Sequence, residues 1–229
     1  MADHSASGAA QRPRRLVLVA GTGTEIGKTW ISVQLLRAWR AAGLTVAARK
    51  PAQSFAPDDA TTDAELLAEA SGEQPDDVCT PARHYEVPMA PPMAAAALGR
   101  PAVLLENLVA EQMWPAGVDV GLVETAGGLR SPQADDGDVL DLARALHVDV
   151  VVLVADAGLG TVHAVRSCAD ALEHAALPFV VILNRYEETD ALHQANLAWL
   201  HDRDGIAVRP WTDDEGPRIA AELAGTAVG

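Results

Sequence analysis

A short apolar segment that runs directly into a glycine-rich loop and then into a helix constrains this chain most strongly. Residues 16–20 read LVLVA, which is typical of a buried β-strand, and residues 21–29 read GTGTEIGKT. Glycines let backbone N–H groups surround phosphate oxygens, and the amino-terminal end of a following helix adds partial positive charge. Lys28 can neutralise phosphate charge, and the Thr29 hydroxyl can ligate Mg²⁺. The segment therefore predicts a loop that binds polyphosphate.

The loop departs from the strict pattern G-x-x-x-x-G-K-[ST] at one place. The first glycine of that pattern falls on Thr22, and Gly21 stands one residue earlier. The strand, the loop, the lysine and the helix are nevertheless in register. We therefore prefer the phosphate-loop interpretation to a chance Gly-Lys-Thr.

The rest of the chain alternates apolar segments of strand length with amphipathic segments of helix length. Strands are expected at residues 45–48, 118–123, 150–154 and 179–183, and helices at residues 28–42, 62–70, 107–114, 138–146, 161–175 and 191–200. Near-continuous apolar strands between amphipathic helices indicate a parallel sheet that is covered on both faces. The prediction is an α/β fold of the P-loop type, doubly wound, with a mostly parallel sheet.

The sequence also predicts how the chain is divided. A length of 229 residues without an internal linker indicates one domain, expected over residues 16–229 behind a disordered tail at residues 1–15. The proline-rich segment at residues 88–93 predicts an irregular loop, with a helix that begins only at Ala94.

The charge balance and the cysteines exclude several kinds of partner. The chain has 17 Lys and Arg against 32 Asp and Glu, a net charge of −15, which repels nucleic acid and anionic membranes. Its apolar runs are far shorter than the roughly 20 residues that span a bilayer. Cys79 and Cys168 share no metal-ligand spacing and suit a reducing compartment. We expect a cytoplasmic protein with no nucleic-acid or membrane partner.

Polar residues follow several of the predicted strands, where ligands of parallel α/β sheets gather. These places are the phosphate loop, Lys50, residues 124–128, residues 156–163, and Asn184 with Arg185. Lys50 could act as a second cation on a transferred phosphate, and Glu124 stands where a Walker-B-type acid is expected. Mg²⁺ prefers hard oxygen ligands, which predicts Thr29, Glu124 and one acid from the loop after the second strand. The sequence alone does not choose among Asp58, Asp59, Asp63 and Glu65.

Taken in order, these pieces resemble the family of ATP-dependent dethiobiotin synthetases. The resemblance runs from about Leu16 to Trp211 and rests on GTGTEIGKT, Lys50-Pro51, Ala90-Pro91-Pro92, Glu124-Thr125-Ala126-Gly127-Gly128, Gly158-Leu159-Gly160-Thr161, Asn184 and Pro210-Trp211. It implies a cytosolic homodimer that uses ATP and Mg²⁺. It also implies the reaction: CO₂ is joined to 7,8-diaminopelargonate, a cyclic urea closes, and ATP is split to ADP and phosphate.

The resemblance assigns roles to individual residues by matching position. It implies Lys28 and Lys50 as catalytic residues. ATP would be bound by Gly23, Thr24, Glu25, Ile26, Gly27, Lys28, Thr29, Asn184 and Pro210, the last two beside the adenine. The metal ligands would be Thr29, Asp63 and Glu124. The amine substrate would contact Thr24, Ser54, Thr125, Gly160 and His163, the last two across a dimer interface.

Departures from the family pattern cluster on the substrate side. Phe55 and Thr125 stand where the family has glycine, His163 ends a turn that usually ends in asparagine, and Ala90-Pro91-Pro92 replaces Ser-Pro-His. A side chain in place of glycine forbids close backbone approach, so we expect a pocket of altered shape. His163 either pairs with a substrate carboxylate or points away from it.

Three hypotheses about function remain open from the sequence. The first is a dethiobiotin synthetase, and the second is a relative that carboxylates or cyclises a different amine. The third is a nucleotide-switch ATPase of the partitioning type, which carries a lysine where this chain has Gly23.

Overall fold

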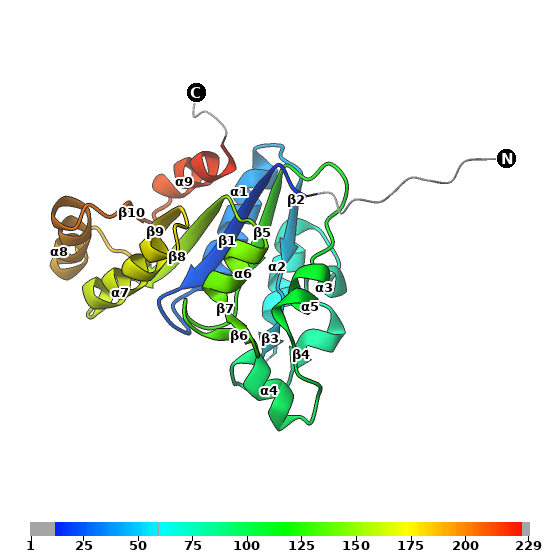
Figure 1. The fold of residues 1–229 in the computed structure, drawn as a ribbon. Helices are drawn as coiled ribbons and strands as arrows, with labels where there is room; N and C mark the ends of the chain where they lie inside the picture. Colours follow the sequence, from blue (N-terminus) through cyan, green and yellow to red (C-terminus); the bar gives the residue numbers. More distant parts are fainter. Residues whose placement is uncertain (1–11, 59, 226–229) are drawn as a thin grey trace.

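Six parallel strands form the central sheet of the protein, whose computed structural model describes residues 12–58 and 60–225 (Figure 1). In spatial order they are β10 (Val208–Pro210), β9 (Phe179–Asn184), β8 (Val150–Asp156), β1 (Arg15–Gly21), β5 (Val120–Glu124) and β2 (Val46–Arg49). Every neighbouring pair in this sheet is parallel. The expected doubly wound α/β fold is confirmed.

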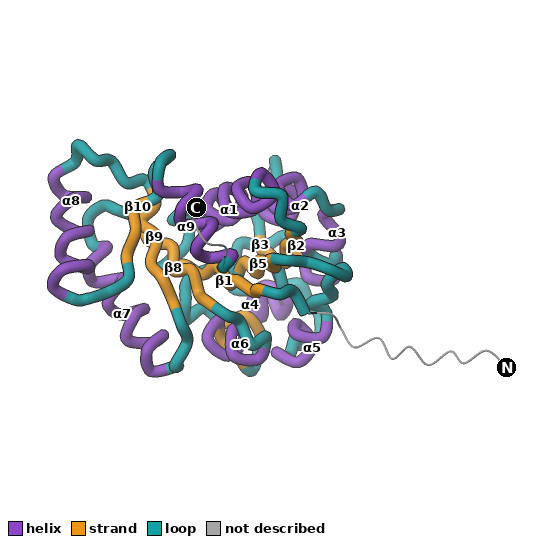
Figure 2. The backbone as a smooth tube through the Cα atoms, turned by 90° about the horizontal axis from the view of Figure 1, so that it is seen from above, coloured by secondary structure: helices purple, strands orange, loops and turns teal. Residues whose placement is uncertain are grey.

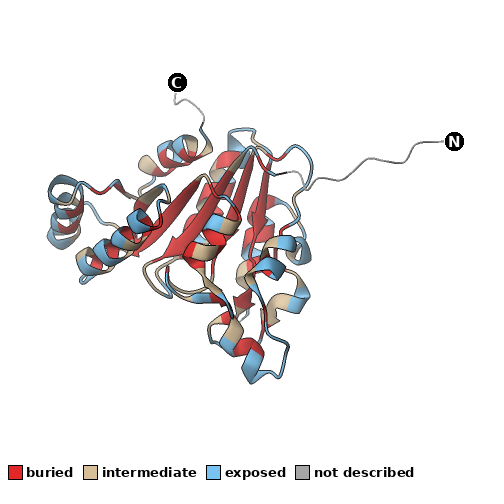
Figure 3. Ribbon diagram, in the orientation of Figure 1, coloured by how far each residue is buried: buried red, intermediate tan, exposed pale blue. Residues whose placement is uncertain are grey.

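Helices cover both faces of this sheet (Figure 2). One face packs against α1 (Lys28–Ala41), α2 (Asp63–Ser71), α3 (Pro75–Val78) and α9 (Glu215–Ala224). The other packs against α5 (Leu105–Ala110), α6 (Val139–Ala145), α7 (Thr161–His174), and the end of α8 (Ala191–Ala198) with its π-helical continuation Trp199–Arg203. Side chains along β1 alternate between the two faces of the sheet and so belong to both hydrophobic cores. Val17 and Val19 face one helix layer, and Leu16 and Leu18 face the other. The central strands β1, β5, β2 and β8 are therefore almost fully buried, whereas β9 and β10 at one side of the sheet are partly exposed (Figure 3).

Small elements extend the structure beyond the carboxyl ends of the main strands. β3 (Gln53–Ser54) pairs in parallel with β4 (His84–Tyr85), which follows a 3₁₀ turn at Pro81–Arg83. β6 (Pro132–Ala134) and β7 (Gly137–Asp138) form an antiparallel pair. Tyr85 is buried against α4 (Pro91–Ala97), so these pieces form a small core of their own beside the loop after β2.

Two helix boundaries differ from the sequence-based expectation by three residues or more. α4 begins at Pro91, before the expected start at Ala94, because prolines are tolerated in the first turn of a helix, where an N–H has no intrahelical partner. α5 ends at Ala110, before the expected Trp114.

The expected tail falls largely outside the described residues, and its last residues are ordered. Arg15 already belongs to β1, and Arg12 and Arg14 form ion pairs with Asp149 and Asp119 at 3.0 and 3.2 Å. Residues 12–15 therefore pack against the domain that is expected to begin at residue 16. None of the described helices is long and apolar enough to cross a bilayer.

Candidate functional site

The phosphate loop connects β1 to α1 through two tightly packed glycines. A Cβ on Gly21 would lie 2.7 Å from Ile26 Cδ1 and 3.0 Å from the carbonyl oxygen of Gly23, so a larger residue here would have to displace its neighbours. Gly27 caps α1 with φ +88°, and a Cβ there would lie 2.1 Å from Asn184 Nδ2. Gly21, the last residue of β1, thus supplies the close approach that the strict pattern places on Thr22.

Residues at the end of β9 hold the outer side of this loop. Asn184 Nδ2 donates to the carbonyl of Ile26 at 2.9 Å, and Arg185 donates to the carbonyl of Glu25 at 2.8 Å. Glu25 itself has φ +57°, a conformation that costs energy for a residue with a side chain. Arg185 also pairs with Asp156 at 2.8 Å. The loop is therefore held in shape from two neighbouring strands.

Lys28 folds back over the loop from the start of α1. Its ammonium donates to the carbonyl of Gly23 at 3.1 Å, and the residue is 8% exposed. Burial lowers the pKa of Lys28, and the nearby Lys50 ammonium lowers it further. An anion bound against the loop would raise the pKa of Lys28 again, because it favours the charged ammonium. This is the behaviour expected of a lysine that binds phosphate.

Lys50 lies at the centre of a cluster that includes two carboxylates. Its ammonium lies 2.6 Å from Asp63 Oδ2 and 2.6 Å from Glu124 Oε1. Strand register explains the second contact, because Val123 of β5 pairs with Arg49 of β2, which places the next residue of each strand side by side. Glu124 is fully buried and Lys50 is 3% exposed. The structure thus brings the residues that follow β2 and end β5 into contact.

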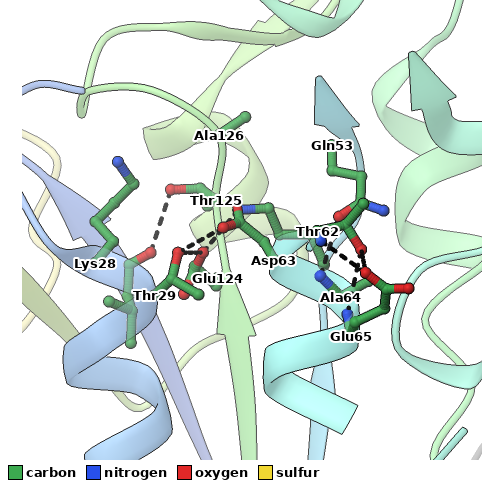
Figure 4. A network of polar contacts seen from close by, with 12 residues as sticks. Lys28, Thr29, Gln53, Thr62, Asp63, Ala64, Glu65, Glu124, Thr125 and Ala126 are labelled. Atoms are coloured by element: carbon green, nitrogen blue, oxygen red, sulfur yellow. Dashed lines mark hydrogen bonds and ion pairs between the residues drawn. The ribbon is translucent and has the colours of Figure 1, made fainter. Parts of the chain in front are cut away.

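The Thr29 hydroxyl completes this cluster from the first turn of α1 (Figure 4). Its oxygen lies 2.8 Å from Asp63 Oδ1 and 3.0 Å from Glu124 Oε1. A hydroxyl has one proton, so it donates to one of the two carboxylates at a time. These three side chains come from different elements: Thr29 from α1, Asp63 from α2 and Glu124 from β5. Both carboxylates nevertheless lie within hydrogen-bond distance of the Thr29 hydroxyl.

Charges within the cluster favour the ionised forms of Lys50 and Asp63. Burial acts to lower the pKa of Lys50, but the carboxylates of Glu124 and Asp63 outweigh it and hold that pKa above its usual value. Burial acts to raise the pKa of Asp63, and the Lys50 ammonium outweighs it, so that pKa lies below its usual value. Lys50 and Asp63 are therefore both charged at neutral pH.

A helix cap selects Asp63 from the acids of its loop. Thr62 is the N-cap of α2 and forms a capping box with Glu65, so the helix begins at Asp63. The backbone N–H of Ala64 donates to Gln53 Oε1 at 3.0 Å, which ties this first turn to β3. The carboxylate of Asp63 is thereby directed toward Thr29 and Lys50.

The donor set fits a magnesium ion that is shared with a phosphate. Glu124 Oε2 is buried and has no hydrogen-bond partner among the described residues, so one hard oxygen is left to serve a cation. No group of three or more His, Cys, Asp or Glu side chains in the described part of the chain is placed to hold a metal ion. Two carboxylates and a hydroxyl match the way Mg²⁺ binds together with substrate phosphates.

A cavity of about 340 Å³ lies over the loop and this cluster. It brings together the expected site residues Thr24, Glu25, Gly27, Lys28, Thr29, Lys50, Ser54 and Asp63. Ala126 and Gly127 form its other wall, and Gln133 holds them by accepting from the N–H of Ala126 at 3.2 Å and donating to its carbonyl at 2.9 Å.

A second cavity of about 340 Å³, on the far side of Gly27, has aromatic walls. Asn184, for which a place beside the adenine was expected, lines it together with Trp30, Tyr186 and Trp211. Trp30 and Trp211 meet edge to face with ring centroids 6.0 Å apart. Pro210 lines a neighbouring depression instead. The sequence reasoning missed Trp30, although its place directly after Thr29 puts it on the outer face of α1.

Three of the expected substrate residues lie apart from these cavities. Thr125 is fully buried, and its hydroxyl donates to the carbonyl of Val19 at 3.2 Å. Its side chain therefore does not line the cavity over the phosphate loop, contrary to the expected effect of replacing glycine there. Gly160 caps α7 with φ +91°. His163 lines a separate depression on α7 with Arg166 and Asp170. Within one chain, the structure does not bring Gly160 and His163 to the phosphate loop.

The fold and the site together define a P-loop nucleotide-binding protein. A family model described as an AAA domain matches residues 15–211. The chain is 39% identical, over 214 residues, to a protein of Anaeromyxobacter dehalogenans (strain 2CP-C) named ATP-dependent dethiobiotin synthetase, covering 90% of this chain and 95% of the relative. A protein of the same name from Caulobacter vibrioides (strain NA1000 / CB15N) is 38% identical, covering 73% and 78%. The chain belongs to the ATP-dependent dethiobiotin synthetase family.

Solved structures with a similar fold come from more distant proteins. A plasmid partition protein from Borrelia burgdorferi superposes with a TM-score of 0.55 at 12% identity, covering 93% of this chain and 97% of the other. Another from Borrelia burgdorferi B31, bound to AMPPNP, gives a TM-score of 0.57 at 13% identity over 93% and 98%. At this identity the likeness shows the fold alone.

Proposed function

We propose that this protein is an ATP-dependent dethiobiotin synthetase, which joins CO₂ to 7,8-diaminopelargonate in a cyclic urea and splits ATP to ADP and phosphate. One observation supports this function beyond family membership. Lys50 and Ser54 lie in the same cavity as the phosphate loop, so an amine-derived carboxylate could meet the outer phosphate of ATP there. A nucleotide switch needs no such second reactant site.

The chemistry needs three steps. One amine of the substrate adds to CO₂ and loses a proton, which gives a carbamate. A carbamate oxygen attacks the γ-phosphorus of ATP, the bond to the bridging oxygen breaks, and ADP leaves. The second amine then attacks the carbonyl carbon and loses a proton, while the bond to phosphate breaks. Phosphorylation is required because a carbamate is a poor acylating group until phosphate becomes its leaving group.

Lys28 and Lys50 would bind different parts of the reacting groups, the γ-phosphate and the carbamate. Lys28 lies over the loop and would hold the γ-phosphate as negative charge moves toward ADP. Lys50 would bind the carbamate and the incoming phosphate from the opposite wall. Ser54 Oγ is buried without a hydrogen-bond partner among the described residues, so it has a free donor for the carbamate. Thr24 and Glu25 line the same cavity and would face the amines.

Thr29, Asp63 and Glu124 would hold Mg²⁺. The ion would neutralise charge on the phosphate oxygens and align them for transfer. The backbone of Gly23, Thr24, Glu25, Ile26 and Gly27 would surround the phosphates. Asn184 would face the adenine, with Trp30 and Trp211 as stacking surfaces and Pro210 behind them.

We further propose a cytoplasmic homodimer in which Gly160 and His163 of one protomer approach the substrate held by the other. Both residues lie at the start of α7, outside the cavities around the phosphate loop. Co-expression of a Lys28→Ala chain with a His163→Asp chain tests this arrangement. Mixed dimers should recover activity that neither variant has alone, and no recovery would contradict a shared site.

The function itself is tested by phosphate release. Purified protein receives MgATP and bicarbonate, with or without 7,8-diaminopelargonate. Release that depends on the diamine, together with formation of the cyclic urea by mass spectrometry, supports the proposal. Release that depends on another amine, with none on this diamine, would instead select the divergent relative.

A further inference from the structure

A larger cavity of about 510 Å³ adjoins the cavity over the phosphate loop. The two share Thr24, Glu25, Ser54, Ala126 and Gly127, so the larger one opens directly from the place where the carbamate would lie. Its remaining walls are Phe55 and Ala56 on one segment, residues 88–91 on another, and Ser131. A substrate that reacts beside Ser54 would place the rest of its carbon chain here.

The part of this lining formed by residues 55, 56 and 88–91 is apolar and suits a hydrocarbon chain. Glu25 is the one ionisable side chain among the described residues that line it, and Phe55 is the one aromatic side chain. Pro88, Met89 and Pro91 add apolar surface away from Lys50. Apolar walls with few polar groups bind apolar ligand segments. None of the described residues that line the cavity is a cation, so we place the carboxylate at the end of the chain beyond its walls.

Phe55 is held in place by its neighbours. Its backbone N–H donates to the carbonyl of Tyr85 at 3.0 Å, which continues the pairing of β3 with β4. Its ring meets the ring of His84 edge to face, with centroids 6.3 Å apart. His84 Nε2 lies within hydrogen-bond distance of the carbonyl of Cys79, at 3.0 Å. Phe55 is therefore a fixed wall, because its support is itself anchored.

We propose that Phe55 determines substrate specificity by limiting the length of the aliphatic chain that the amine substrate can carry. This inference rests on the proposed function, because it concerns the amine of the same reaction. A benzyl group fills space that a smaller residue would leave to the substrate. In an apolar pocket one methylene changes kcat/KM by about 10-fold to 200-fold. Removing the ring should therefore move the preferred chain length upward.

The experiment uses a series of straight-chain vicinal diamino acids that differ only in the number of methylenes between the diamine and the carboxylate. The full-length protein and its variants Phe55→Leu and Phe55→Gly receive MgATP, bicarbonate and each acid. Diamine-dependent phosphate release gives kcat and KM separately. Trp199→Ala is the matched control, since Trp199 is a half-exposed aromatic residue on the turn after α8.

We expect the unmodified protein and Trp199→Ala to share one preferred length. For acids longer than this by two methylenes, Phe55→Gly should exceed the unmodified protein in kcat/KM by at least about 10-fold, mainly through a lower KM. Phe55→Leu should fall between them. Affinity for ATP should be equal in all four proteins, because Phe55 does not line the cavity over the phosphate loop.

Two results would overturn the inference. If the length preference of Phe55→Leu or Phe55→Gly equals that of the unmodified protein while turnover persists, Phe55 does not set it, although the proposed function stands. If no acid of the series supports phosphate release in any of the four proteins, the proposed function fails and this inference fails with it. Phe55→Leu keeps the test decisive if Phe55→Gly does not fold.

Discussion

The ammonium of Lys50 lies 2.6 Å from Glu124 Oε1, in a pair whose side chains are 3% and 0% exposed. Buried ion pairs add little net stability, because desolvation offsets their attraction, but breaking one leaves an uncompensated buried charge. This pair also has a second carboxylate, Asp63, on the same ammonium. Such a concentration of charge is expected where both the lysine and the carboxylates serve phosphate and a cation.

Replacing Lys50 by Met should lower the free energy of unfolding by about 3 kcal/mol, because Glu124 and Asp63 then face each other without a cation. Mg²⁺ should restore part of this loss by binding the freed carboxylates. Urea unfolding with and without Mg²⁺ measures both effects. An unchanged midpoint in both conditions would contradict the cluster described above.

Arg49→Met is the matched control for that variant. Arg49 directly precedes Lys50 in the chain and forms a buried ion pair with Glu73 at 2.7 Å. Unlike Lys50, it does not pair with a carboxylate of the phosphate-binding cluster. Its loss should also destabilise the protein, whereas Mg²⁺ should give no recovery beyond that seen for the unmodified protein.

Affinity for ATP should fall as the pH rises, through Lys28. Burial and the Lys50 ammonium lower the pKa of Lys28, so it loses its charge at a lower pH than an ordinary lysine. Phosphate favours the charged form, and binding therefore takes up a proton at pH values around and above the lowered pKa of Lys28. Calorimetry in buffers of different ionisation enthalpy measures this uptake. In Lys28→Arg the guanidinium stays charged, so the uptake should vanish, and an equal uptake in both proteins would assign it elsewhere.

Trp30→Ala should weaken ATP binding by roughly 10-fold, because stacking of a base on an aromatic side chain is worth about 1–3 kcal/mol. Trp30 is 48% exposed on α1, so the fold should tolerate the change. Affinity for inorganic triphosphate, which has no base, should be unaltered. Equal losses for both ligands would show that Trp30 supports the loop and not the base.

Gly21→Ala should lower the free energy of unfolding by about 1–3 kcal/mol, since the added methyl group would press on the carbonyl of Gly23 and on Ile26. Gly23→Ala is the internal comparison, because a Cβ there meets nothing within 4 Å. Its unfolding free energy should change by less than about 0.5 kcal/mol. Equal effects at the two glycines would contradict the packing of the loop.

Local patterns predicted the elements that carry the phosphate loop. β1 and α1 were expected almost to the residue because their periodicities and the glycines between them are local properties. A local pattern could also have selected Asp63 over Asp58. Thr62 and Glu65 have the spacing of a capping box, which predicts that the helix begins at Asp63. Without that signal the acids of this loop stayed undecided from the residues alone, and only the family resemblance pointed to Asp63.

Other features depend on contacts that a single sequence does not display. β10 was not predicted, because a strand of three residues gives a weak periodic signal. α9 was not predicted either, although its buried residues Ile219, Ala220 and Leu223 recur at helical spacing. The place of β5 between β1 and β2 brings Glu124 to Lys50, and the order of strands in a sheet is not a local property. The inward direction of Thr125 was likewise invisible, because it depends on the carbonyl of Val19 in a neighbouring strand.

The central claim is that a carbamate oxygen receives the γ-phosphate of ATP in the cavity between Lys28 and Lys50. The most direct test supplies ¹⁸O-labelled CO₂ with MgATP and 7,8-diaminopelargonate, and stops the reaction before the label exchanges with water. Mass spectrometry of the released phosphate should then find one ¹⁸O atom per phosphate, with the second ¹⁸O in the carbonyl of the cyclic urea. Phosphate released without label, at a rate that does not depend on the diamine, would contradict the account.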